Sequence, residues 1–470
     1  MKIKLIAIAV GLACAASVPV AQATNGYMSH GYSPIARGMA GADTALPQDA
    51  ASMIDNPAGL VEVGGRAEIA VNWFSPIRKY TGADLTAGAL GPVGSNLTGG
   101  EVESRNNDFL IPTCAYSYVL DANSAIGAAL YGNGGMNTQY GSQFTAFDFG
   151  TYGGNSQNNL FGLGGGNTGV NLEQMGLALS YSRRLNESFN LGASLVLAAQ
   201  SFEAKGLGAF AGFTEVTTQS LISSRGQAPV VPQNLTDNDA EWSYGAGVQL
   251  GGLWKVNPMV DLGFSYRTKV YMTKFDSYSD LFANGGEFDI PAVASIGLAF
   301  KPTDQLSFAL DVQQIWYSEV DAIGNSNQLA QKCDVGSVFG QPNFGGTYDA
   351  SYCLGGSNGA GFGWSDATVI KFGVQYAINP EWTVRAGYSH QNQIIPESEV
   401  PFNVLAPAVI TDHWTIGVTN KIAKNYEITG WAMYAPEETV SGASAFTAGS
   451  SPSISMKQYE VGIAFSWLFN

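Results

Sequence analysis

Apolar and polar residues alternate with a period of two along most of this chain. Val260, Leu262, Phe264 and Tyr266, for example, alternate with Asp, Gly and Ser. This period is typical of a β-strand with one face toward hydrocarbon and the other toward a more polar space. Fourteen segments carry it: 66–80, 105–120, 123–135, 172–185, 188–203, 240–256, 258–273, 288–302, 304–317, 366–379, 381–393, 411–423, 425–437 and 456–469.

Short and long connections alternate between these segments. Six connections are short and polar, and each contains Asn, Asp or Pro, which favour tight reversals. They lie at 121–124, 185–188, 256–258, 301–304, 379–381 and 423–425. Long, glycine-rich loops occupy the other connections. An even strand number with short turns at one end and long loops at the other predicts an all-β fold: a 14-stranded antiparallel transmembrane β-barrel in the outer membrane of a Gram-negative bacterium.

Composition favours the same fold. The chain is 45% hydrophobic but only 13% charged, whereas soluble proteins carry about 25% charged residues. No stretch after the first 23 residues has the roughly 18 consecutive apolar residues of a membrane helix. The strand segments, of about 12–17 residues, exceed the roughly 9–11 that a tilted strand needs to cross the bilayer. We therefore expect the barrel to extend beyond the membrane.

The amino-terminal residues predict two further regions. Residues 1–23 have the basic start, apolar centre and small-residue cleavage site of a secretory signal peptide. Residues 24–65 lack the period-two pattern, and short helical turns are expected at 34–40 and 47–54. We call 24–65 the hatch, because a segment of this length can fold back into the lumen of a barrel formed by 66–470. Small residues on the inward phase of the fifth and sixth strands, such as Gly192 and Gly251, would leave room for it.

Charge and motif content exclude other classes of function. A net charge of −16 argues against nucleic-acid binding, which needs a basic surface. Acidic groups at the rim would instead face outer-membrane lipid and lipopolysaccharide, through bridging divalent cations. Only three histidines are present, without the motifs of metal hydrolases or nucleophile elbows. We predict no enzyme activity, no cofactor and no metal site. Cys333 and Cys353 share one long loop, and export permits a disulfide between them.

Several motifs carry a resemblance to a known family. Three features resemble the hatch of the FadL family, whose members are outer-membrane transporters for long-chain fatty acids and aromatic hydrocarbons. They are Arg37 with the glycine-rich run to Ala42, the acidic residues that follow, and Asn56-Pro57-Ala58. Segments 171–204, 382–388 and 409–417 are similar to the family as well. The resemblance implies a monomeric barrel with a plugged lumen. Its implied hatch residues are Arg37, Asp55, Asn56, Pro57 and Ala58.

The family resemblance also implies a route for the ligand. Members take a hydrophobic ligand from an external groove into an internal pocket and release it sideways, through a gap at an inward kink of the third strand. Here the third strand reaches Tyr131 and then meets a glycine-rich break. Glycine within a strand often marks a bend, so Asn133, Gly134 and Gly135 are the candidate lateral gate. The alternative is that the strand simply ends there at an external loop.

Candidate ligand contacts are cationic or aromatic. A buried carboxylate would need a cation; Lys269 is the first choice by strand parity, and Lys205 is the second. Aromatic loop residues form either an external capture groove or a self-packed cluster; they include Phe144, Phe147, Phe149 and Phe210. Arg385, near the periplasmic end, is expected to anchor a hatch carboxylate, Asp49 or Asp55.

The sequence therefore predicts uptake of hydrophobic small molecules, with long-chain fatty acids as the first choice. Aromatic or aliphatic hydrocarbons carried by the same route are the alternative. A general porin or a structural surface barrel is the second alternative.

Overall fold

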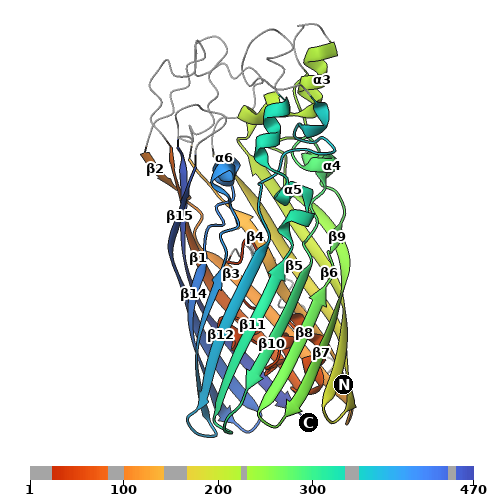
Figure 1. Cartoon of the computed structure of the whole chain (residues 1–470), viewed down its shortest axis with the longest axis vertical. Helices are drawn as coiled ribbons and strands as arrows, with labels where there is room; N and C mark the ends of the chain where they lie inside the picture. Colours follow the sequence, from red (N-terminus) through yellow and green to blue (C-terminus); the bar gives the residue numbers. More distant parts are fainter. Residues whose placement is uncertain are drawn as a thin grey trace.

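Fourteen long strands form a closed cylinder (Figure 1). The computed structural model describes residues 24–82, 100–141, 167–223, 230–333, 349–442 and 451–469. The barrel strands are β1 (Gly65–Gly82), β3 (Phe109–Asp121), β4 (Ser124–Asn137), β5 (Gly169–Asn186), β6 (Phe189–Lys205), β7 (Glu241–Asn257), β8 (Val260–Arg267), β10 (Val293–Phe300), β11 (Leu306–Ile315), β12 (Ala367–Ala377), β13 (Trp382–Gln391), β14 (Asp412–Ala423), β15 (Tyr426–Ser441) and β16 (Ser453–Phe469). Two short strands, β2 (Gly100–Glu103) and β9 (Tyr271–Met272), pair with β1 and β7.

Closure removes the open edges of the sheet. Neighbouring strands pair antiparallel, and β16 returns to β1 over a register that runs from Gly65 opposite Phe469 to Thr81 opposite Ser453. Lipid offers no hydrogen bonds to an unpaired strand, so only a closed sheet is stable in the membrane. The prediction of a 14-stranded antiparallel barrel is confirmed.

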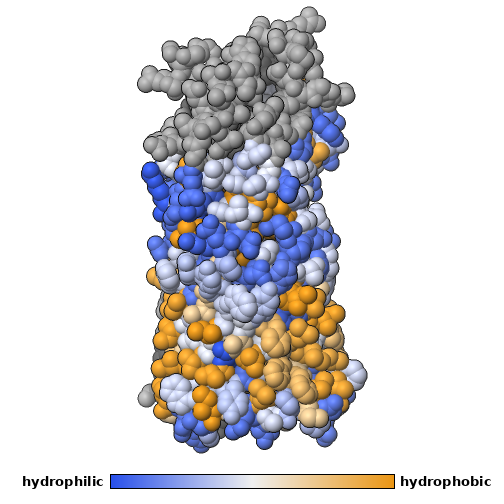
Figure 2. Space-filling view, turned by 60° about the vertical axis from the view of Figure 1, so that its left-hand side comes forward, coloured by the Kyte–Doolittle hydropathy of each residue, from blue (hydrophilic) through white to orange (hydrophobic). Residues whose placement is uncertain are grey.

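The period-two pattern separates an outer from an inner face. On β1, Ile69, Val71 and Trp73 are exposed, while Glu68 and Asn72 are buried. On the face that Figure 2 shows, apolar side chains gather over the lower part of the cylinder, with mostly hydrophilic residues above them. The barrel therefore extends beyond this apolar region, as its strand lengths predicted.

The hatch lies inside the lower half of the barrel (Figure 1). It contains one short α-helix, α2 (Pro34–Arg37), and two 3-10 helices, η1 (Ala50–Ile54) and η2 (Pro57–Val61). Each begins with a side-chain cap: Ser33, Asp49 and Asn56 accept hydrogen bonds from the backbone N–H groups of Ala36, Ser52 and Ala58. The first two turns were predicted and η2 was not. The hatch ends at Gly64, since β1 begins at Gly65.

Inward-facing glycines make the space that the hatch fills. A Cβ atom at Gly251 would overlap Asn56 Oδ1, and one at Gly192 would overlap the backbone of Pro57. Among the described residues, seven more barrel glycines contact the hatch in the same way: Gly127, Gly134, Gly263, Gly297, Gly373, Gly387 and Gly417. The small inward residues predicted on the fifth and sixth strands thus belong to a glycine ring that runs around much of the lumen.

Short helices gather at the upper end of the barrel (Figure 1). They are η3 (Gly208–Phe213), α3 (Glu215–Ser223), η4 (Asp276–Tyr278), α4 (Ala283–Gly286), η5 (Tyr317–Glu319), α5 (Asp321–Gly324), η6 (Asn327–Cys333), η8 (Ala350–Tyr352), η9 (Glu397–Glu399) and α6 (Val400–Asn403). Within the described ranges, every helix is too short or too polar to span a membrane. Cys333 and Cys353 form a disulfide with a Cα–Cα distance of 4.9 Å.

The glycine ring makes a testable prediction about the hatch. We expect Gly251→Val to displace the hatch, because a side chain there overlaps Asn56, and to expose Arg37 to trypsin in the purified protein. Gly430→Ala on β15 is the control, since its Cβ would meet nothing closer than 3.8 Å. Equal protection of Arg37 in both variants would contradict close packing at the glycine ring.

Candidate functional site

An apolar pocket lies among the upper helices, with lining residues from η3, α5 and α6. Its empty volume is about 450 Å³. Its lining contains no charged residue and consists of Val170, Phe202, Leu207, Phe210, Leu281, Phe282, Ala322, Leu354, Ala360, Gly361, Phe362, Phe402 and Leu405. Aromatic rings make edge contacts across it, at centroid distances of 5.2 Å for Phe210 and Phe402 and 4.7 Å for Phe202 and Phe282. Such a surface suits an apolar molecule, because it offers dispersion contacts and no polar group to satisfy.

The disulfide helps to hold one wall of this pocket. Leu354, directly after Cys353, donates its N–H to the Phe213 carbonyl at 2.9 Å and accepts from the Glu215 N–H at 2.9 Å. Thr218 of α3 packs its hydroxyl 3.3 Å from Cys353 Sγ. The loop that the disulfide closes is therefore tied to η3, which carries the pocket residue Phe210.

The two predicted lysine contacts lie outside the apolar pocket. Lys205 is exposed and pairs with Glu203 at 2.8 Å. The Lys269 ammonium donates to the Glu319 carbonyl at 2.7 Å and lies 3.9 Å from Asp289. Strand parity had placed Lys269 inward, but β8 ends at Arg267, so parity no longer governs its direction. Of the predicted aromatic residues, Phe210 lines the pocket, whereas Phe144, Phe147 and Phe149 lie outside the described residues.

The wall of the barrel is not fully paired between β3 and β4. Their last register pair is Thr113 opposite Tyr131. Above that pair, the barrel strand that Phe109 to Pro112 align with is β1, and the one that Gly132 to Asn137 align with is β5. Pro112 lacks the N–H that a paired strand would donate. We call this unpaired stretch the wall opening.

The third barrel strand, β4, bends inward at the wall opening. Its register with β5 shifts between Gly132 and Gly134, so Asn133 is a bulge residue. All residues from Tyr131 to Asn137 are buried, and the alternation of exposed and buried positions is lost. The strand does not end at this break, which removes the alternative of a simple strand end.

The hatch pairs with the bent strand from inside. Met28 forms a β-bridge with Gly134, and Gly135 donates its N–H to the Tyr27 carbonyl at 2.9 Å. A Cβ atom at Gly134 would overlap that same carbonyl. Outside the opening, Leu110 and Trp73 are 50% and 40% exposed. The unpaired stretch therefore lies between the hatch on the inside and an apolar surface on the outside.

The apolar pocket and the wall opening are contiguous. Val170, which lines the pocket, accepts a hydrogen bond from the Thr138 N–H at 2.9 Å, directly after the end of β4. Thr138 Oγ1 donates to the carbonyl of another pocket residue, Leu405, at 2.7 Å. One apolar cluster includes Phe202 of the pocket and Tyr27 at the bend. Residues of the pocket and of the bend thus belong to one packed apolar cluster.

Buried polar contacts fasten the hatch to the barrel. Arg37 forms an ion pair with Glu460 of β16 at 2.6 Å, and Trp431 Nε1 donates to the same carboxylate at 2.6 Å. Asn56 donates from its amide to the Thr44 carbonyl at 2.7 Å and to the Gly252 carbonyl at 3.1 Å. These contacts join the hatch to β7, β15 and β16.

Arg385 contacts the hatch, but not through a carboxylate. It donates to Thr419 Oγ1 at 2.7 Å and lies 3.5 Å from the side-chain oxygen of Gln48. The Asp49 carboxylate instead accepts from Ser33 Oγ at 2.6 Å and caps η1. The expected pairing of Arg385 with Asp49 or Asp55 is therefore replaced by an amide contact, because local capping already uses Asp49.

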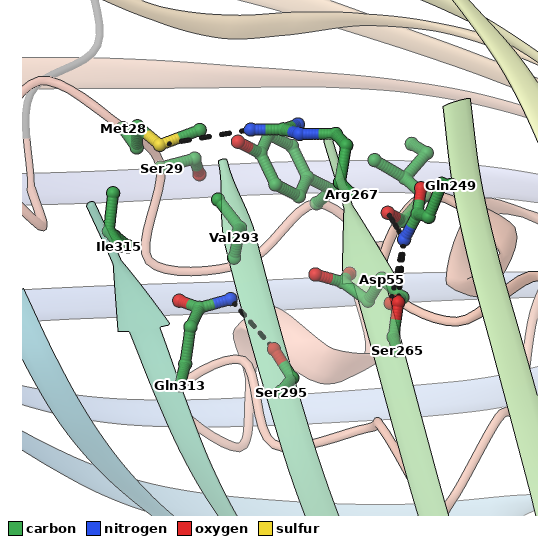
Figure 3. A pocket seen from close by; sticks show the side chains of 12 residues that line it. Met28, Ser29, Asp55, Gln249, Ser265, Arg267, Val293, Ser295, Gln313 and Ile315 are labelled. Carbon is green, nitrogen blue, oxygen red and sulfur yellow. Dashed lines mark hydrogen bonds between the residues drawn. The ribbon is translucent and has the colours of Figure 1, made fainter. Parts of the chain in front are cut away.

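A second, polar cavity lies beside the hatch (Figure 3). Its empty volume is about 370 Å³. It is lined by Met28, Ser29, Tyr32, Ile54, Asp55, Gln249, Ser265, Arg267, Val293, Ser295, Gln313 and Ile315. Burial raises the pKa of Asp55 to about 6. Sequence reasoning did not identify this cavity, since only the fold brings the hatch and four barrel strands together there.

A closed barrel with a folded plug, an apolar pocket and a side opening defines a class of outer-membrane transport protein rather than an open pore. The profile of the family described as "Outer membrane protein transport protein (OMPP1/FadL/TodX)" matches residues 12–429, and the chain belongs to this family. It is an outer-membrane transporter of hydrophobic compounds and not an enzyme. No curated protein matches it by sequence.

Solved structures share the fold at low sequence identity. The toluene transporter TodX of P. putida has a TM-score of 0.64 and 19% identity, covering 94% of this chain and 99% of that one. A Pseudomonas aeruginosa FadL homologue has a TM-score of 0.63 and 16% identity, with 97% and 100% covered. The Ralstonia pickettii toluene transporter TbuX has a TM-score of 0.59 and 18% identity, with 94% and 99% covered. At such low identities, the structural similarity shows a common fold.

Removal of the ion pair between hatch and barrel is expected to lower the stability of the protein. Arg37→Met leaves the Glu460 carboxylate buried without its cation, and breaking a buried pair in this way costs about 3–5 kcal/mol. We expect a lower urea midpoint for the purified protein, and partial recovery in the Arg37→Met/Glu460→Gln double variant. A midpoint equal to that of the wild type would show that the pair does not hold the hatch.

Proposed function

We propose that this protein takes up aromatic or aliphatic hydrocarbons through the apolar pocket and releases them sideways through the wall opening. The observation that carries the choice of substrate is the pocket lining, which has no charged residue. A fatty acid would bring a carboxylate that needs a cation. Both candidate lysines have other partners, Glu203 for Lys205 and the Glu319 carbonyl for Lys269. A hydrocarbon needs neither lysine.

The position of the hatch supports sideways release, because the hatch blocks a straight path down the lumen. Below the pocket, the hatch fills the lumen against the glycine ring. The cavity beside the hatch contains Arg267 and Asp55, and an apolar molecule would have to desolvate such groups to move down through it. The wall opening leads instead toward Leu110 and Trp73 on the outer apolar face. An apolar ligand gains more by leaving toward lipid than by continuing toward the periplasm.

The choice of substrate makes a prediction about ligand binding. Phe402→Ala removes one ring of the pocket, and the loss of one aromatic contact of about 0.5–1.5 kcal/mol should weaken toluene binding up to about tenfold. Equilibrium binding of radiolabelled toluene to the purified protein measures this, with oleate as competitor. Phe300→Ala, which removes a ring from the outer face, is the matched control. Oleate binding far tighter than toluene would favour fatty acids instead.

The exit route makes a separate prediction. Gly132 is a buried residue at the wall opening, whereas Ala128 lies lower on β4, where the wall is closed and Ala128 pairs with Tyr116. We expect Gly132→Phe to reduce toluene uptake by cells about tenfold, by filling the opening, while toluene binding stays unchanged. Ala128→Phe should leave uptake intact. Normal uptake by the Gly132→Phe variant would place the exit elsewhere.

A further inference from the structure

The bulge residue of β4 is held by side chains from three directions. Arg267 Nη1 donates to Asn133 Oδ1 at 3.1 Å. Asn133 Nδ2 donates to Gln174 Oε1 on the neighbouring strand at 2.9 Å, and the Tyr32 hydroxyl of the hatch donates to the Asn133 carbonyl at 3.0 Å. Asn133 is 2% exposed. The inward bend therefore has a defined set of polar contacts at its apex.

Arg267 is an unusual partner for this amide. It is the last residue of β8, and β5, β6 and β7 separate β8 from β4 around the barrel. Its side chain reaches over the polar cavity, where Nη2 lies 3.8 Å from Met28 Sδ (Figure 3). In the described part of the chain, no carboxylate lies within 4.0 Å of this guanidinium, although the residue is only 4% exposed.

The contacts of Arg267 indicate what its buried charge does. A buried cation is costly unless it is paired, and a charge-assisted hydrogen bond is stronger than a neutral one. The Asn133 amide on β4 accepts such a bond from Arg267, and the hydroxyls of Tyr32 and Tyr131 interact with the same guanidinium. Gln174 continues the polar row by donating to Gln200 Oε1 at 2.9 Å, so the far side of Asn133 is fixed as well. The Arg267 guanidinium on β8 thus restrains the apex of the bend in β4, on another part of the barrel wall.

We propose that Arg267 is the positioning residue of the wall opening: it holds Asn133, and with it the segment 132–135, inside the barrel. Loss of this hydrogen bond weakens the restraint on the bend and favours a β4 that straightens and continues its ladder with β3, whose next pairs would be Pro112 with Gly132 and then Ile111 with Asn133. Straightening closes the wall. The inference deepens the proposed function, since it concerns the same exit.

Cross-linking measures the position of β4 directly. A cysteine pair replacing Pro112 and Gly132 reports closure, and a pair replacing Ala115 and Ala129, which already face each other in the closed ladder, is the positive control. Both pairs are placed in a Cys114→Ser background, which leaves the introduced pair and the Cys333–Cys353 disulfide in the barrel. We expect a low yield for the first pair with Arg267 present and a yield several-fold higher with Arg267→Met. The second pair should cross-link equally in both.

Three further variants separate positioning from folding. Asn133→Ala removes the same hydrogen bond without touching the cation and should raise the cross-link yield as Arg267→Met does, with no additional increase in the double variant. Arg267→Lys keeps the charge and a donor and should restore part of the low yield. Arg183→Met, at an exposed arginine of β5, is the matched control and should have no effect.

Transport measurements distinguish this inference from the proposed exit. Arg267→Met should reduce toluene uptake about tenfold, the factor expected from losing a hydrogen bond to a charged group, while toluene affinity of the purified protein stays unchanged. A cross-link yield independent of Arg267 would overturn the positioning role. A raised yield with normal uptake would support positioning but contradict exit through this opening. Loss of toluene binding in Arg267→Met would make Arg267 a ligand contact and overturn the inference.

Discussion

The packing of the hatch against the inner wall of the barrel is the constraint on which the other features depend. Glycines such as Gly192 and Gly251 let the backbone of η2 approach the strands more closely than any side chain would allow. The buried pair of Arg37 and Glu460 then joins the hatch to β16. A desolvated ion pair needs fixed geometry, and the close packing at the glycine ring contributes to it.

A lumen filled in this way changes what the remaining parts can do. The apolar pocket lies among the upper helices, and the lumen below it is occupied by the hatch and by a polar cavity. The bend of β4 offers a way out through the wall, and the hatch takes part in forming it through Tyr27 and Met28. The hatch thus blocks the path down the lumen and also takes part in forming the wall opening.

Local sequence pattern was sufficient for most of the fold. Strand alternation depends only on neighbouring residues, so all fourteen strands and their short turns could be predicted. The hatch was recognisable from the loss of this pattern and from Asn56-Pro57-Ala58. The disulfide between Cys333 and Cys353 followed from their shared loop, and Phe210 from the aromatic content of its loop.

Features that depend on distant strands could not be predicted in the same way. Lys269 was placed inward because parity assumes an unbroken strand, and β8 ends two residues earlier. Arg385 was assigned a carboxylate partner, but the capping role of Asp49 is visible only once η1 is formed. The contact between Arg267 and Asn133 crosses three intervening strands, and strand period carries no information on such pairs.

Ion conductance in a planar bilayer tests the central claim most directly. If the hatch remains lodged in the lumen, the reconstituted protein should pass little steady current, far below that of an open barrel of fourteen strands. A large and stable conductance would mean that water runs from one mouth to the other. An open channel of that kind would not require a lateral exit. This result would contradict a plugged lumen with lateral release.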